Sequence, residues 1–347
     1  MSLPDPRRYG NGARSELAAL AETGGPAFVS AVSRAVEEGR DGDITAAYGA
    51  VTSRAAYRNL WEAVATAVDA TPTDAAVVTR VFAMPWLLVC GARERVTISC
   101  VLSDVAALAK VLEDAGALGA NRNLGFANTL TDLDALERVP PSTLRAWTSG
   151  TGLLRDLPPS PLALAPGEET VHLRFLLGAA VSAPQAAGIA DTATNVAAWG
   201  MKATAEMARQ LAQPGSDVLP MARPPMSVMR AAYAGRQAGL EAAFNLFFSN
   251  TLRRFRLKVG DATLVMSSHE GGEVRVTLRS ALDEGMTEGY RWPLHPLDDI
   301  DGIADAIVSF ARECRVLDIV TVPEVLPDTT STGALLFPTI PAGTPRH

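Results

Sequence analysis

The pattern of hydrophobic and polar positions along the chain predicts a helical beginning, over residues 15–39 and 43–69. In the second segment apolar residues return at three- and four-residue steps, as in Leu60, Val64 and Val68. That spacing places them on one face of a helix, which needs a partner to cover it. The first part of the chain is therefore predicted to be mainly helical.

A small β-hairpin is predicted next, because an apolar run at 81–90 is followed by alternating apolar and polar positions at 95–102. Pro85 has no N–H to donate to a ladder, so we expect an edge position or a bulge there rather than a central strand. Short helices are predicted over 121–147. Residues 1–150 are therefore expected to form a mainly helical domain with one hairpin.

A glycine- and proline-rich stretch at 148–168 breaks this pattern, and we place the main domain boundary there. A strand and two helices are predicted after it, the helices at about 191–213 and 227–250. The second domain is expected to span residues 165–340 and to be α+β, with 341–347 as a tail.

The clearest pattern lies within residues 253–322, which we predict to fold as one compact subunit. Apolar and polar positions alternate over 254–259, 262–267 and 274–279, which predicts a three-stranded antiparallel meander with one apolar face. A helix from about 298 to 312 carries an apolar stripe that fits this face. The predicted fold class is α+β: a helical N-terminal region with a small β-hairpin, and a C-terminal antiparallel sheet backed by helices.

The register expected for the meander gathers basic side chains on its polar face. Val259 is placed opposite Ala262 and His269 opposite Glu273, so that the cations fall in neighbouring rows. They are Arg254, Arg256, Lys258, Arg275 and Arg279. Such a face is either solvated or neutralised by the same chain, or it docks a small anion or an acidic partner. A sheet that binds RNA would show stacking aromatic residues on this face, and none is present, so no nucleic acid is expected.

Two apolar features favour contact with a protein partner. Five of the nine methionines fall between 201 and 229, and methionine either fills irregular cores or lines adaptable surfaces. The segment 333–340 is apolar, and it can add a strand to its own sheet or to a neighbouring subunit. The residues expected to contact a partner are Met221, Met226, Met229, Leu335, Leu336 and Phe337.

Composition and charge narrow the class of protein. The net charge of −7 argues against a nucleic-acid coat or a binder of anionic membranes. The longest apolar run is shorter than the roughly 20 residues of a membrane span, and the N-terminal sequence lacks the apolar core of a secretory signal. Three scattered cysteines favour a reducing cytoplasm, and 28 arginines against 3 lysines indicate a GC-rich bacterial genome.

The sequence contains no strong catalytic, metal or cofactor motif, so we expect no metal and no cofactor. The leading hypothesis is a bacterial cytoplasmic protein that acts by association, as an assembly, adaptor or scaffold component, with a protein partner or as a homo-oligomer. The alternative is an enzyme, of a family that the sequence does not reveal, which holds an anionic substrate on the arginine-rich sheet face. Ser267, His269 and Glu270 would then be the nearest reactive groups.

Overall fold

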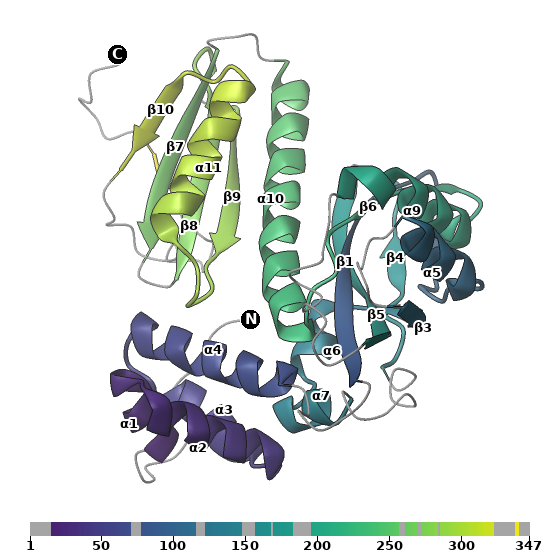
Figure 1. Ribbon diagram of the computed structural model, residues 1–347. Helices are drawn as coiled ribbons and strands as arrows, with labels where there is room; N and C mark the ends of the chain where they lie inside the picture. Colours follow the sequence, from purple (N-terminus) through teal and green to yellow (C-terminus); the bar gives the residue numbers. More distant parts are fainter. Residues whose placement is uncertain are drawn as a thin grey trace. The chain divides into compact units, whose positions relative to one another are not determined.

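The computed structural model describes most of the chain, and these residues form an α+β protein. The described ranges are 15–70, 78–115, 122–147, 157–167, 169–182, 196–256, 261–269, 272–283, 285–322 and 337–339. The chain divides into two compact units, Met1–Gly239 and Leu240–His347, called unit 1 and unit 2 below. The division falls inside the long helix α10 (Val228–Phe255; Figure 1) and not near 148–168, where we had placed the domain boundary.

Unit 1 begins with four helices where the sequence predicted two. They are α1 (Glu16–Thr23), α2 (Pro26–Glu37), α3 (Asp41–Ala50) and α4 (Arg54–Asp69). The first predicted helix is divided at Gly24 and Gly25, whose φ angles of 66° and 93° lie in the region that favours glycine. Ser53 begins α4, because its hydroxyl accepts a hydrogen bond from the backbone N–H three residues further on. Leu60 and Val64 are buried, which confirms the predicted apolar face of α4.

A four-stranded antiparallel sheet forms the centre of unit 1, in the order β3-β5-β1-β6. Its strands are β1 (Val78–Ala92), β3 (Arg122–Thr131), β5 (Thr170–Ser182) and β6 (Ser216–Ala222). The predicted hairpin between 81–90 and 95–102 is wrong, because β1 pairs with β5 and β6. These partners come from beyond the stretch 148–168, which explains why that stretch does not separate two compact units.

Two further differences concern the short elements of unit 1. Strand β2 (Val96–Ile98) pairs with β4 (Leu162–Leu164) and not with β1. The stretch 121–147 is helical only in its second part, where α6 (Leu133–Glu137) and α7 (Pro141–Trp147) follow β3. The polar residues of β3 gave no alternating pattern, so its strand was not visible in the sequence.

Pro85 lies on the central strand β1, where a bulge in the neighbouring strand accommodates it. Ala83 exchanges both backbone hydrogen bonds with Met226, at 2.9 and 3.0 Å, whereas Trp86 lies opposite Ala222. Three steps along β1 thus match four steps along its partner, so one extra residue is inserted there. The bulge faces the side on which Pro85 has no N–H to donate. The expected bulge is therefore present, but the strand is central.

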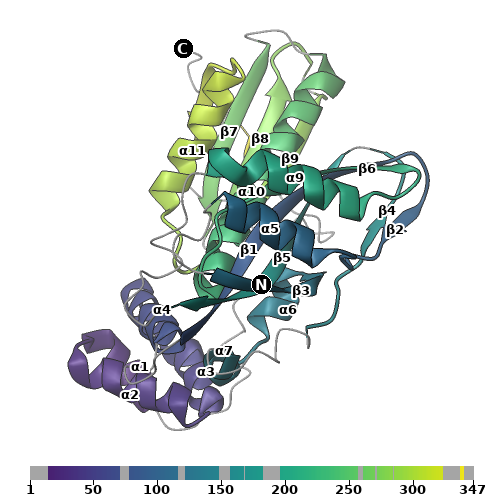
Figure 2. The ribbon, with the colours of Figure 1, turned by 45° about the vertical axis from the view of Figure 1, so that its right-hand side comes forward.

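Helices cover both faces of the unit 1 sheet. On one face α5 (Val105–Asp114) and α9 (Val196–Leu211) lie side by side (Figure 2), and Trp199 packs there with Trp86 and Leu176. On the other face Phe175 belongs to a core cluster that includes the N-terminal helices and the beginning of α10.

Unit 2 contains a mixed four-stranded sheet, in the order β10-β7-β8-β9, with only β10 parallel to its neighbour. The elements are β7 (Ala262–His269), β8 (Glu273–Ser280), β9 (Thr287–Pro293), α11 (Ile300–Glu313) and β10 (Asp318–Thr321). The strand predicted at 254–259 is wrong, because α10 continues to Phe255 and the third antiparallel strand is β9. Arginines in the last turn of α10 suit a helix C-terminus, since they face the negative end of the helix dipole.

The predicted register of β7 and β8 is confirmed. His269 pairs with Glu273 and Ser267 with Arg275, as the expected register requires. Ile307 of α11 lies in one core cluster with the apolar residues of β7 and β8 and with the aromatic residues of α10. Figure 1 shows α10 and α11 beside the sheet of unit 2. Apolar residues of both helices pack against the inner face of that sheet.

Candidate functional site

Of the five cations predicted for one sheet face, the structure describes four and places two of them on that face. Arg254 belongs to α10 and forms an ion pair with Glu288 at 2.8 Å. Arg256 is exposed just after that helix, and Lys258 lies outside the described residues. Arg275 and Arg279 do lie on the outer face of the unit 2 sheet, opposite Ser267 and Thr263.

Arg275 lies on this outer face as part of a buried salt bridge. Its Nε lies 2.6 Å from Oε1 of Glu273, and the two side chains are only 2% and 3% exposed. The second carboxylate oxygen of Glu273 accepts a hydrogen bond from Arg291 of β9. A buried charge pair of this kind offsets its own desolvation cost only while both partners are present. The positive charge of Arg275 is therefore neutralised within the chain.

Of the groups named for the enzyme alternative, the structure describes Ser267 and the backbone of His269. Ser267 is buried beside Arg275, His269 ends β7, and Glu270 lies outside the described residues. An anionic substrate would have to compete with Glu273 for Arg275. The structure thus offers no observation that favours this alternative.

A row of small and apolar side chains crosses the outer face next to the salt bridge. Register pairs connect Val320, Val265, Thr277 and Gly289, which come from β10, β7, β8 and β9 in that order. The described C-terminal residues 337–339 contact this row. They are not part of a strand, and the rest of the segment 333–340, for which a strand added to this sheet or to a neighbouring subunit was predicted, lies outside the described residues.

Two contacts hold this segment. The Thr277 hydroxyl donates a hydrogen bond to the backbone carbonyl of Pro338 at 2.7 Å. The ring of Phe337 lies over Gly289, where an added Cβ would be 2.5 Å from the ring. We call Thr277 and Gly289 together the Phe–Pro seat.

The six residues expected to contact a partner lie in different surroundings. Met226 and Met229 are half-buried against the core of unit 1. Leu335 and Leu336 lie outside the described residues, and Phe337 contacts the Phe–Pro seat of its own chain. Of the four among these six that the structure describes, only Met221 is exposed.

Met221 belongs to an exposed apolar surface on β6. Leu219 and Met221 point to the same side of this edge strand and are 56% and 36% exposed. Val89 of β1 lies directly opposite Leu219 and lines an open groove of about 620 Å³ with it. We call Val89, Leu219 and Met221 the β6 surface. Two carboxylates, of Glu169 and Asp217, also line the groove.

The free edge of β6 is poorly suited to pairing with another strand. The backbone N–H of Arg93 donates a hydrogen bond to the carbonyl of Gly215. The backbone N–H of Arg223 donates one to the carbonyl of Pro85, and both bonds are 2.9 Å long. Odd-numbered residues of β6 thus direct their backbone groups toward β1, and even-numbered residues direct theirs to the free edge. Pro220 is one of the latter and has no N–H, so it interrupts any added ladder.

The cysteines do not provide a reactive centre. Burial raises the pKa of the Cys90 thiol to about 11 and also raises the pKa of Cys100. Both thiols are therefore protonated near neutral pH, and a thiol is a poor nucleophile compared with a thiolate. The described residues also hold no group of three or more His, Cys, Asp and Glu placed to bind a metal ion.

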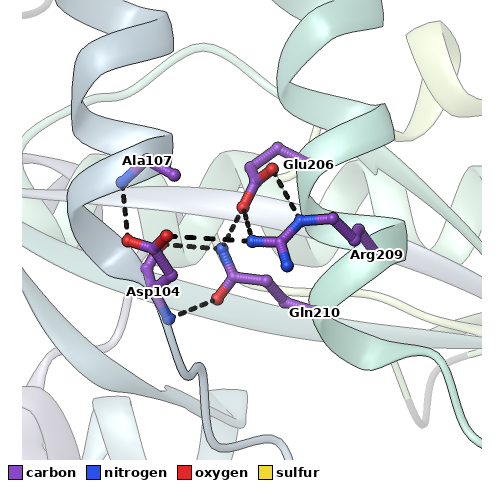
Figure 3. A network of polar contacts seen from close by, with 5 residues as sticks. All are labelled: Asp104, Ala107, Glu206, Arg209 and Gln210. Atoms are coloured by element: carbon purple, nitrogen blue, oxygen red, sulfur yellow. Dashed lines mark hydrogen bonds and ion pairs between the residues drawn. The ribbon is translucent and has the colours of Figure 1, made fainter.

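A polar network joins α5 to α9 (Figure 3). Gln210 accepts a hydrogen bond from the N–H of Asp104 at 3.1 Å and donates one to its carbonyl at 2.8 Å. Glu206 receives two hydrogen bonds from Arg209, at 3.0 and 2.6 Å, and one from Gln210. Arg209 lowers the pKa of Glu206 through these bonds. Because every member has a partner inside the network, we interpret it as a clamp between two helices.

Comparison with known proteins identifies no relative. No family model, no curated protein and no solved structure matches this chain. Across the described part of the chain, no helix combines the length and apolar character needed to cross a membrane.

Proposed function

We propose that this protein acts by association with other protein chains, as an assembly, adaptor or scaffold component of a bacterial cytoplasm. The observation that carries the proposal is the β6 surface, where Leu219 and Met221 are exposed next to an open groove. Adjacent exposed apolar side chains beside a groove are typical of a protein interface. The three free cysteines, two of them buried, agree with a reducing compartment.

The chemistry of the groove indicates what kind of partner fits. Val89 and Leu219 in the groove suit an apolar anchor. Met221, two residues further along β6 and not part of the groove lining, is exposed and can adapt its shape to different anchors. The carboxylates of Glu169 and Asp217 favour a cationic side chain beside that anchor. Since Pro220 interrupts the free edge, we expect contact through side chains of a helix or loop rather than through an added strand.

A charge placed on the β6 surface tests this proposal. Leu219→Asp should reduce partner recovery about tenfold or more, because burying an aspartate costs the interface more than the lost leucine contributes. Met201→Asp is the matched control: Met201 is 83% exposed on α9 and does not line the groove. Recovery is measured by quantitative affinity capture from the producing cells. A captured protein whose recovery falls with Leu219→Asp but not with Met201→Asp supports the proposal. Equal recovery by the wild type and both variants contradicts it.

A further inference from the structure

We infer that residues 337–339 form an intramolecular latch on the outer face of the unit 2 sheet, and that this latch can be released from Thr277 and Gly289 without unfolding the sheet. The occupant of the Phe–Pro seat is thus a segment of the chain itself, which makes both contacts. The inference is independent of the β6 surface, because the seat lies in unit 2 and involves other residues.

Thr277 provides the polar contact of the closed latch. The residue is 1% exposed, and a buried hydroxyl needs a hydrogen-bond partner, which the Pro338 carbonyl supplies at 2.7 Å. Pro338 is itself buried, and it has no N–H that burial leaves unsatisfied. A proline at this position therefore enters the seat without the loss of a backbone hydrogen bond.

Gly289 provides the steric contact. It is the register partner of Thr277, and its φ angle lies outside the left-handed region, so the backbone alone does not require glycine there. What requires it is the Phe337 ring, because a Cβ at Gly289 would lie 2.5 Å from that ring. Carbon atoms in favourable contact are about 3.5–4.0 Å apart. Gly289 therefore admits the ring, and a larger side chain at this position displaces it.

The closed latch is held by one hydrogen bond and one ring contact rather than by a strand ladder. Residues 337–339 are not in a strand, whereas β8 pairs with β7 on one side and with β9 on the other. Pro338 is buried and Thr339 is exposed, so the segment returns to the surface at once. So short a contact belongs to the low-stability end of native-state opening. Its release breaks no hydrogen bond between the strands.

A label at position 339 reports the state of the latch in the full-length chain. Thr339→Cys supplies an exposed thiol, and Cys314→Ser removes one that is only partly buried. Cys90 and Cys100 are buried and should not react. Electron paramagnetic resonance then measures the mobility of a nitroxide attached at position 339. Adding Gly289→Val should shorten its rotational correlation time at least about twofold, because released segments move on the nanosecond scale.

Phe337→Ala opens the same contact from the side of the segment. It removes the ring and leaves the seat intact, so it should raise the mobility of the label as much as Gly289→Val does. The double variant should show no further increase, because the two changes act on one contact. Valine favours a strand, so the circular dichroism of every variant should match that of the labelled parent.

Gly125→Val is the matched control. It alters a strand glycine of unit 1 whose Cβ would meet nothing within 4 Å, so the mobility at position 339 should stay unchanged. Equal mobility in the parent, Gly289→Val and Phe337→Ala overturns the latch, and so does an equal increase in the control. Loss of the folded circular dichroism in Phe337→Ala overturns release without unfolding. Leu219→Asp, which tests the β6 surface, should leave the label unaffected.

Discussion

Glu273 is the residue that pairs with buried Arg275 on the outer face of the unit 2 sheet. Replacing it by glutamine removes the negative charge beside buried Arg275. We expect Glu273→Gln to lower the free energy of unfolding by about 3–5 kcal/mol, because the buried guanidinium loses its charged partner. Urea denaturation measures the loss. Glu288→Gln is the control: its ion pair with Arg254 is partly exposed, so its loss should stay below about 1 kcal/mol. Equal losses in both variants would argue against the buried salt bridge.

Tyr290 gives unit 2 a dependence on alkaline pH. Burial raises the pKa of its phenol from 10.0 to about 12, and the hydroxyl donates to the carbonyl of Leu240 at 3.2 Å. Since the folded protein holds this proton more tightly than the unfolded chain, the related stability is complete below pH 10 and is lost as the pH rises toward 12. Tyr290→Phe should therefore flatten the decline in unfolding free energy over this range. An unchanged slope in the variant would show that Tyr290 is not the group responsible.

At the residue scale, the sequence predicted which residues lie opposite each other in the sheet better than which side chains contact one another. The register placed Arg275 opposite Ser267 correctly. Alternation along β8 also places Glu273 on the same face as Arg275, so a carboxylate lies beside the predicted cations. That Phe337 would lie over Gly289 could not be predicted, because no local pattern connects residues that distant in the chain.

At the element scale, Gln210 connects α5 to α9 through both backbone groups of Asp104. We expect Gln210→Ala to cost about 1–2 kcal/mol of unfolding free energy, since each net hydrogen bond contributes about 0.5–1.5 kcal/mol. Lys110→Ala removes only an exposed ion pair with Asp114, at 3.8 Å, and should cost below about 0.5 kcal/mol. Thermal unfolding compares the two variants. If Gln210→Ala is no more destabilising than Lys110→Ala, the clamp has no measurable role in stability.

Ile307 tests the packing of α11 on the unit 2 sheet. Its side chain is buried in the cluster shared with β7, β8 and α10. Ile307→Ala should cost about 2–5 kcal/mol, because truncation loses apolar burial and leaves a cavity. Leu282→Ala, at an exposed position, should change stability by no more than about 0.5 kcal/mol. A denaturant titration in which Ile307→Ala loses less than about half a kcal/mol would contradict the packing described for α11.

The elements that the sequence predicted well are those whose pattern has one interpretation. The stripe of α11 and the alternation of β7 and β8 each have a single regular period. Residues 254–259 alternate as a strand does, yet α10 continues through the first of them, because a basic last turn is equally compatible with a helix. The pairing of β1 with β5 and β6 depends on residues about 80 or more positions away, which no hairpin rule can indicate.

At the scale of the whole molecule, the two units carry different kinds of surface. Unit 1 has the apolar β6 surface. Pro220 on the free edge of β6 has no N–H to donate to an added strand. Unit 2 has an outer sheet face that carries the buried Glu273–Arg275 pair and is contacted by residues 337–339 of the chain itself. The hydrophobic pattern predicted the α+β fold class. The glycine- and proline-rich stretch at 148–168 does not mark the division between the compact units, which falls inside helix α10.

The most direct test of function by association is photo-crosslinking from the β6 surface. A photoreactive amino acid replaces Leu219 in one protein and Met201 in a control, because both side chains are exposed in unit 1 and only Leu219 lines the groove. After irradiation of the producing cells, we expect discrete covalent adducts from position 219 and none of the same mass from position 201. Identical adduct patterns from the two positions, or no adduct from position 219, would contradict the proposal that this surface binds another protein.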